Sequence, residues 1–132
     1  MDKLQAITAP VGRLFLATIF VVAGLQKIPA YTGTQGYMDA MGVPGVLLPL
    51  VIILEVVGGL MIILGWKTKL AAISLAGFSI LSALLFHADF ADQTHMIMFM
   101  KNFALAGAFL LLFAQGSGSY SLDNRKNQLL GE

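Results

Sequence analysis

The feature that most constrains this chain is a set of four apolar stretches, each long enough to cross a lipid bilayer. A helix needs about 20 residues, within a range of about 17–25, to span the hydrocarbon core. The stretches are rich in Leu and Ile with scattered Gly and Ala, as membrane helices are, and they do not alternate as membrane strands do. They cover about residues 9–28, 46–66, 70–86 and 96–114. The sequence therefore predicts an all-α integral membrane protein, an antiparallel four-helix transmembrane bundle.

The composition excludes several other classes of protein. Apolar residues make up 58% of the 132 residues and charged residues 11%, against about 45–50% and about 25% in soluble domains. The net charge of +1 gives no reason to expect nucleic acid as a partner. The chain has no cysteine, which excludes thiol nucleophiles, thiolate metal sites and iron–sulfur clusters. Any redox chemistry would therefore need a bound cofactor, a lipid-soluble carrier or another subunit.

The distribution of basic residues predicts how the chain is oriented. Residues 1–115 form the expected membrane domain, and residues 116–132 form a short polar tail. Lys67 and Lys69 lie in a tight turn between the second and third spans, and two further basic residues lie in the tail. By the positive-inside rule, this turn and both termini face the cytoplasm. A signal peptide is the alternative for the first stretch, but no convincing cleavage site follows it.

The connection between the first and second spans is the longest and predicts a short helix on the outer face. Thr34 is expected to cap this helix, which runs through Met41 and is ended by Gly42 and Pro44. Tyrosine and methionine residues give the segment an apolar side. We therefore expect it to lie along the membrane surface or over the mouth of the bundle.

Five ionisable residues lie within or at the ends of the spans, and their scarcity makes them candidate site residues. A charge at mid-span costs about 2.5–3.5 kcal/mol on insertion scales and usually faces the bundle interior. From the helical rise, Glu55 lies roughly 14 Å below the outer surface and Lys101 about 6–8 Å deep. Lys27 and His87 lie nearer the outer interface, and Arg13 lies on the cytoplasmic side of Glu55.

These residues support two interpretations. In the structural one, Glu55 forms a buried ion pair with Arg13 or with Lys101 and so specifies how the helices pack. In the functional one, four residues line a polar pocket that is open to the outer face and binds an anion or polar head group or handles protons. These four are Glu55, His87, Lys101 and Lys27. A third alternative is that each charge snorkels separately to the interface.

No metal site is expected from the two histidines. His87 and His95 are eight residues apart, and the sequence predicts no helix between them. The methionines that follow His95 fit a role as lipid-facing or core residues better than a role as copper ligands.

Taken in order, several short motifs resemble the DoxX family over nearly the whole chain. They are Arg13 with the following apolar run and the segment Ala23–Lys27, the segment Leu54–Gly59 with Leu64 and Gly65, His87, the segment Met98–Asn102, and the tail segment Gly116–Asp123. The resemblance implies a four-helix protein of the bacterial inner membrane. It also implies relatives associated with a terminal quinol oxidase, with thiosulfate-to-quinone electron transfer, or with oxidative-stress complexes.

Two functions from different classes are compatible with these features. The first is a redox-associated membrane subunit that handles a quinone or small molecule in the polar pocket, together with a membrane or peripheral redox partner. In it, Glu55 and His87 handle protons, while Lys101 and Lys27 hold an anionic or carbonyl oxygen. The second is a non-enzymatic membrane partner or assembly subunit whose buried charges are structural and whose Gly- and Ala-bearing faces dock other helices. Homo-oligomerisation is compatible with both, and a small transporter is a weaker third option.

Overall fold

The protein, seen here in a computed structural model, consists of helices and their connections, with no strand between residues 3 and 129, the range that the structure describes. Residues 1–2 and 130–132, the outer ends of the predicted membrane domain and tail, lie outside it. Four helices are long and apolar enough to cross a membrane, which confirms the predicted all-α membrane bundle. The elements are α1 (Lys3–Lys27), α2 (Tyr31–Ala40), the 3-10 helix η1 (Gly45–Leu47), α3 (Leu48–Leu64), α4 (Thr68–Phe86), α5 (Gln93–Gln115) and α6 (Leu122–Leu129).

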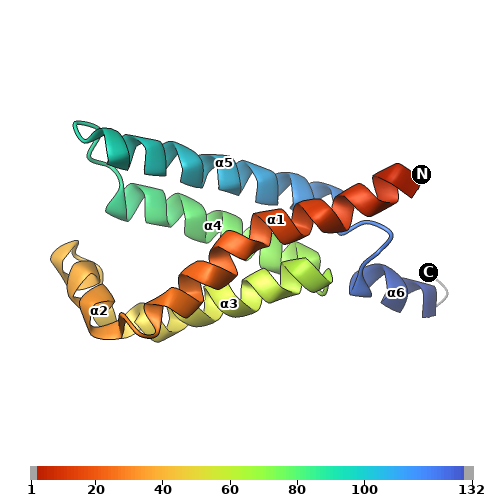
Figure 1. Cartoon of the computed structure of the whole chain (residues 1–132), viewed down its shortest axis with the longest axis horizontal. Helices are drawn as coiled ribbons and strands as arrows, with labels where there is room; N and C mark the ends of the chain where they lie inside the picture. Colours follow the sequence, from red (N-terminus) through yellow and green to blue (C-terminus); the bar gives the residue numbers. More distant parts are fainter. Residues whose placement is uncertain (1–2, 130–132) are drawn as a thin grey trace.

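The four long helices form two closely packed pairs, α1 with α3 and α4 with α5, and α3 packs on α4 between them. Figure 1 shows both ends of the chain and α6 at one end of the bundle. At the other end lie α2 and the connection between α4 and α5. We call these the terminal end and the α2 end.

The observed helix bounds differ from the predicted ones by a few residues at each span, and most at the start of α1. The helix α1 begins at Lys3, earlier than the apolar stretch, because a helix can continue through polar residues beyond the hydrocarbon core. The predicted short helix is present as α2, but Thr34 does not cap it. The Thr34 hydroxyl donates to the Ala30 carbonyl at 2.9 Å, so Thr34 lies inside the first turn. The helix ends before Gly42, which has a φ of +82° that favours glycine.

Glycines set the close approach and the register of α1 against α3. A Cβ atom added at Gly24 would lie 2.6 Å from Val56, and one added at Gly59 would lie 2.6 Å from Val21. Both distances are too short for a real contact, so only glycine allows this packing. Because the two helices are antiparallel, the C-terminal end of α1 lies level with Glu55.

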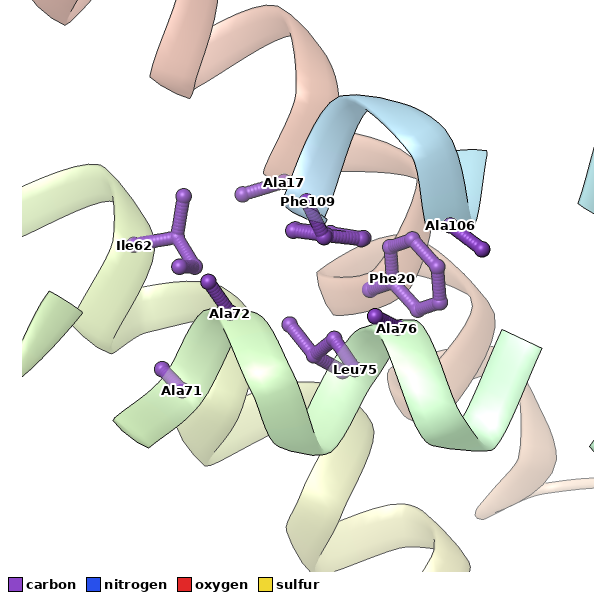
Figure 2. Close-up of a cluster of buried hydrophobic side chains, with 9 residues drawn as sticks. All are labelled: Ala17, Phe20, Ile62, Ala71, Ala72, Leu75, Ala76, Ala106 and Phe109. Atoms are coloured by element: carbon purple, nitrogen blue, oxygen red, sulfur yellow. The ribbon is translucent and has the colours of Figure 1, made fainter. Parts of the chain in front are cut away.

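Apolar side chains from all four spans meet in one core cluster, shown in Figure 2. Phe20 of α1 and Phe109 of α5 meet edge to face, with ring centroids 5.3 Å apart. Leu75 of α4 and Ile62 of α3 are fully buried in the same cluster. This cluster holds the two helix pairs together and closes the space between them on the terminal side.

The tail does not extend away from the bundle but contacts its terminal end. The Asp123 carboxylate accepts hydrogen bonds from the amides of Lys67 at 2.7 Å and Thr68 at 2.9 Å. It therefore caps the first turn of α4, where unpaired amides favour a negative charge. The Asp123 amide in turn donates to the Gly65 carbonyl at 2.8 Å. The tail thus fastens the turn between α3 and α4.

Candidate functional site

A cavity of about 260 Å³ lies between the two helix pairs, toward the α2 end of the bundle. Helices α1 to α5 all contribute to its wall. Most of the surface of the wall is apolar, although half of the lining residues carry a polar or ionisable group. The polar and ionisable residues that line it are Lys27, Thr34, Tyr37, Glu55, Ser79, Ser82, His87, Lys101 and Asn102. The structure therefore brings all four predicted pocket residues to one cavity.

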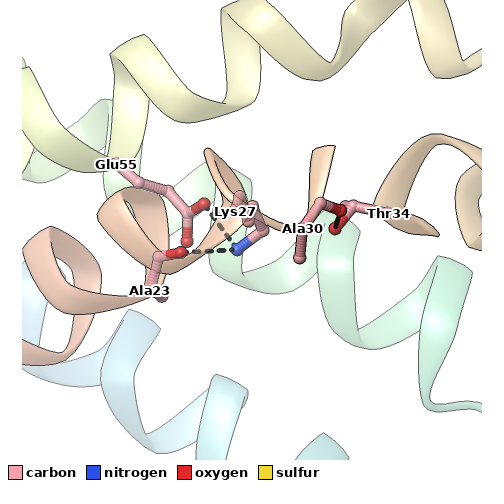
Figure 3. A network of polar contacts seen from close by, with 5 residues as sticks. All are labelled: Ala23, Lys27, Ala30, Thr34 and Glu55. Atoms are coloured by element: carbon pink, nitrogen blue, oxygen red, sulfur yellow. Dashed lines mark hydrogen bonds and ion pairs between the residues drawn. The ribbon is translucent and has the colours of Figure 1, made fainter. Parts of the chain in front are cut away.

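The most buried charge in this cavity is Glu55. Its side chain is 5% exposed, and its Oε1 lies 2.8 Å from the Nζ of Lys27, whose side chain is 28% exposed. Figure 3 shows the lysine reaching back along α1, where its Nζ also lies 3.5 Å from the Ala23 carbonyl. The register set by Gly24 brings these two side chains together. The buried carboxylate of Glu55 is therefore paired with the partly exposed ammonium of Lys27.

The expected pairs of Glu55 with Arg13 or Lys101 are not formed. Arg13 is 3% exposed, and its guanidinium donates to the carbonyls of Ile62 at 3.0 Å and Ile63 at 3.1 Å. It also donates to the carbonyl of Tyr120 in the tail. Those α3 carbonyls lie about 10 Å along the helix from Glu55 at a rise of 1.5 Å per residue. Arg13 therefore belongs to the terminal end and is not part of the cavity.

Lys101 supplies the cavity with a cation that has no carboxylate within 4.0 Å in the part of the chain that the structure describes. Its Nζ lies 3.6 Å from the Met98 sulfur, and the side chain is exposed. Because Lys27 and Glu55 neutralise each other, the charge of Lys101 gives the cavity a net positive character. Such a cavity favours an oxygen-bearing or anionic group.

His87 reaches the cavity from the C-terminal end of α4 and contacts His95 in the first turn of α5. The two Nδ1 atoms lie 3.1 Å apart, which is a hydrogen bond in which one ring donates its N–H and the other accepts through its unprotonated nitrogen. Burial, the nearby His95 and the charge of Lys101 lower the pKa of His87 below its ordinary value. Within residues 3–129, no group of three metal-ligating side chains that could hold a metal ion includes this pair.

Sequence reasoning missed the contribution of His95 and of the uncharged polar residues. The short connection between α4 and α5 brings His95 to His87, a contact that spacing along the chain alone does not predict. Ser79 and Ser82 lie three residues apart on α4 and so share the face that lines the cavity. The Ser79 hydroxyl already donates to the Leu75 carbonyl at 2.8 Å. Asn102 also lines the cavity. It could have been predicted from the sequence, because it is a polar residue within an apolar span and follows Lys101 directly.

Helix α2 covers the cavity at its own end of the bundle. Met38 is buried, and the ring of Tyr37 stacks on Phe86 of α4, with centroids 5.5 Å apart. The backbone of the α2–η1 connection is held by Asp39, which accepts from the Gly45 amide at 2.8 Å. The cavity is thus covered at one end, and its wall combines a mainly apolar surface with several polar side chains, as the walls of small-molecule sites commonly do.

Comparisons with known proteins agree with this architecture. The chain matches the model of the DoxX family over residues 9–88. It is 48% identical over 128 residues to the inner membrane protein YqjF of Escherichia coli K12, covering 97% of this chain and 98% of that protein. It is 34% identical over 123 residues to the inner membrane protein YphA of the same organism, covering 87% of each. No solved structure gives a significant match.

Proposed function

The chain belongs to the DoxX family, and from this premise we propose that it is a redox-associated subunit of the bacterial inner membrane, with both termini in the cytoplasm. In this proposal, the cavity binds a quinone or a small molecule of similar shape. The observation that carries it is the position of Glu55, Lys27 and Lys101 around one mainly apolar cavity. A quinone needs such surroundings, because its ring is apolar and its carbonyl oxygens accept hydrogen bonds.

Each polar group has a defined part in this proposal. Lys101 donates to a carbonyl or anionic oxygen, since no carboxylate within 4.0 Å competes for it in the described residues. Lys27 and Glu55 form a neutral pair that can exchange a proton with the ligand. His87 and His95 supply a second proton-handling pair. Reduction of a quinone also needs electrons, which in a chain without cysteine would come from a membrane or peripheral redox partner.

The test is direct binding of a benzoquinone to the purified protein in a mild detergent, measured by equilibrium dialysis. Removing the cation with Lys101→Met should weaken binding about tenfold, since a hydrogen bond to a charged group contributes about 1.5–3 kcal/mol. Lys69→Met is the matched control, because Lys69 is exposed and lies outside the cavity. If the unmodified protein binds no quinone, the proposal fails.

A second candidate function is that of an assembly subunit, and the exposure of α5 favours it. Of the four spans, α5 is the least buried in the bundle. Its residues Ala104, Gly107 and Ala108 share one face, and a Cβ added at Gly107 would meet nothing within 4 Å. Small residues on an open face allow close approach of another membrane helix. In this function, the Glu55 pair would be structural.

One substitution distinguishes the assembly function from quinone binding. Gly107→Leu should disrupt a partner or a second copy on α5 without changing quinone affinity, because Gly107 lies outside the cavity. The measurements are the oligomeric mass in detergent and co-purification with membrane proteins. Gly77→Leu is the matched control, since Gly77 on α4 is also exposed and also meets nothing within 4 Å. Unchanged mass and co-purification would remove this candidate.

A further inference from the structure

The cavity has one side that no closely packed helix contact closes. On the terminal side it is closed by the core cluster around Phe20 and Phe109. At the other end it is covered by α2, through Met38 and the stack of Tyr37 on Phe86. The pairs α1–α3 and α4–α5, and the α3–α4 contact, close three further sides. What remains is the side between α1 and α5, which do not form a closely packed pair.

The residues on this remaining side reach the outer surface of the bundle. Ile19 of α1 lines the cavity and is also 39% exposed. On α5, Leu105 and Met98 also line the cavity and are partly exposed. Ile19 lies near the middle of α1, about 12 Å along the helix from Lys27. The surface reached there faces the hydrocarbon core of the bilayer.

The size of the cavity limits what it can enclose. Its volume of about 260 Å³ is just below the range of about 300–1,000 Å³ of pockets that enclose drug-sized ligands. A single ring with its oxygen substituents fits such a space, while a long hydrocarbon chain does not. A chain attached to the ring would have to leave through the side between α1 and α5.

From these observations we infer that the ligand is a lipid-soluble amphiphile, with an oxygen-bearing ring in the cavity and an apolar chain that passes between α1 and α5 into the lipid. This inference rests on the proposed function and narrows its ligand to a membrane-borne quinone. The ring exchanges with the bilayer through this gap, which we call the lateral portal, defined by Ile19, Met98 and Leu105. The ligand then reaches the site without crossing the aqueous phase.

The first test uses two probes, a benzoquinone with a decyl chain and the same quinone without the chain, on protein in lipid nanodiscs. Ile19→Trp fills the lateral portal, and Val22→Trp is the matched control, since Val22 is similarly exposed at 44% and lies outside the cavity. The lateral portal predicts that Ile19→Trp weakens binding of the decyl compound at least about tenfold, the effect of losing roughly two buried methylene contacts. Binding of the chainless compound to the Ile19→Trp protein should change little. Val22→Trp should change the binding of neither compound.

The second test uses the absence of native cysteine. In Ile19→Cys, a maleimide can react only at the lateral portal. The decyl quinone should slow this reaction, and the chainless quinone should not. In Val22→Cys, neither compound should slow it. This small substitution keeps the inference testable if Ile19→Trp fails to fold.

The outcomes distinguish this inference from the proposed function. Suppose that the chainless quinone binds, and that the decyl quinone binds the Ile19→Trp protein as tightly as it binds the unmodified protein. The lateral portal is then wrong, while the proposed function stands. The same holds if the decyl quinone gives Ile19→Cys no protection although it binds. If neither quinone binds the unmodified protein, both are wrong.

Discussion

The Nζ of Lys27 lies 2.8 Å from the Oε1 of Glu55, and the two side chains are exposed to very different degrees, 28% and 5%. The pair is therefore asymmetric. A lysine left without its partner can turn its ammonium toward the interface. A glutamate left without its partner at this depth keeps a buried carboxyl group among apolar side chains.

This asymmetry predicts unequal costs for the two halves of the pair. Lys27→Met should lower the free energy of unfolding by about 3 kcal/mol, because it leaves the buried Glu55 carboxylate unpaired. Glu55→Gln should cost about 1 kcal/mol or less, and the double variant should recover much of the loss. The measurement is unfolding by SDS titration in mixed micelles, with Lys69→Met as the surface control. Equal losses for the two single variants would contradict the asymmetry.

Arg13 joins three segments at the terminal end, and lysine should not replace it. Its guanidinium donates to carbonyls of Ile62, Ile63 and Tyr120, and a lysine lacks the planar fork that reaches several acceptors at once. Arg13→Lys should lower the free energy of unfolding by about 3 kcal/mol, since each hydrogen bond to a charged group is worth about 1.5–3 kcal/mol.

The same variant should release the tail, which limited proteolysis after residue 116 would detect. Arg125→Lys, at an exposed position, is the control for a change of the same chemistry. Proteolysis of the Arg13→Lys tail at the rate of the unmodified protein would show that Arg13 does not hold the tail.

Asp123 makes the terminal end sensitive to acid. Burial raises the pKa of its carboxyl, but hydrogen bonds from Thr68 and Lys67 and the charge of Arg13 outweigh it and lower the pKa below the ordinary value of 3.8. The stability that the carboxylate provides is therefore present above about pH 3.8 and is lost as the pH falls through the lowered pKa.

Asp123→Asn should lower the free energy of unfolding at neutral pH by about 1 kcal/mol, as for the loss of a helix cap. The difference from the unmodified protein should shrink below pH 3.8. The measurement is stability as a function of pH for both proteins. A difference that is constant over this range would mean that the carboxylate charge plays no part.

His87 should titrate below its ordinary pKa. Burial, His95 and Lys101 each lower the pKa of His87 from 6.5, so its neutral form is favoured in the folded protein. The corresponding stability is present above about pH 6.5 and is lost as the pH falls through the lowered pKa. His95→Gln or Lys101→Met should raise the pKa of His87. Neither substitution should restore the ordinary value of 6.5, because burial is the largest cause of the lowered pKa.

Carbon-detected NMR of labelled histidine rings in the two variants would measure this pKa. Lys69→Met is the control for the loss of a lysine far from the pair and should leave the titration of His87 unchanged. A lower pKa of His87 in His95→Gln would contradict the geometry of the contact.

Two glycines should respond to the same substitution in opposite ways. Gly59→Ala places a Cβ atom 2.6 Å from a methyl group of Val21, so that side chain or the two helices must shift, and overpacking of this kind costs about 1–3 kcal/mol. Gly77→Ala meets nothing within 4 Å and should stabilise the protein by up to about 1 kcal/mol through helix propensity. SDS titration measures both. Loss of stability in Gly77→Ala would point to a neighbour on α4 that the isolated chain lacks.

Much of the fold follows from the sequence because it depends on local properties. The number of spans is set by the length of the apolar stretches, and the lipid requires each stretch to be a helix. The tight turn at Lys67 makes α3 and α4 antiparallel neighbours. The four predicted pocket residues also line one cavity, because ionisable side chains within or at the ends of spans avoid lipid.

The sequence by itself therefore determined the four spans, the short helix between the first two spans, and the ionisable residues that line the cavity. Only the tertiary structure decided which of these residues meet. Glu55 pairs with Lys27 and not with Arg13, because the approach of Gly24 and Gly59 fixes the register of α1 against α3. The contacts of His87 with His95, and of the tail with Arg13, join residues that are not neighbours on one helix. Such contacts depend on how helices approach each other, which local patterns along a single chain do not specify.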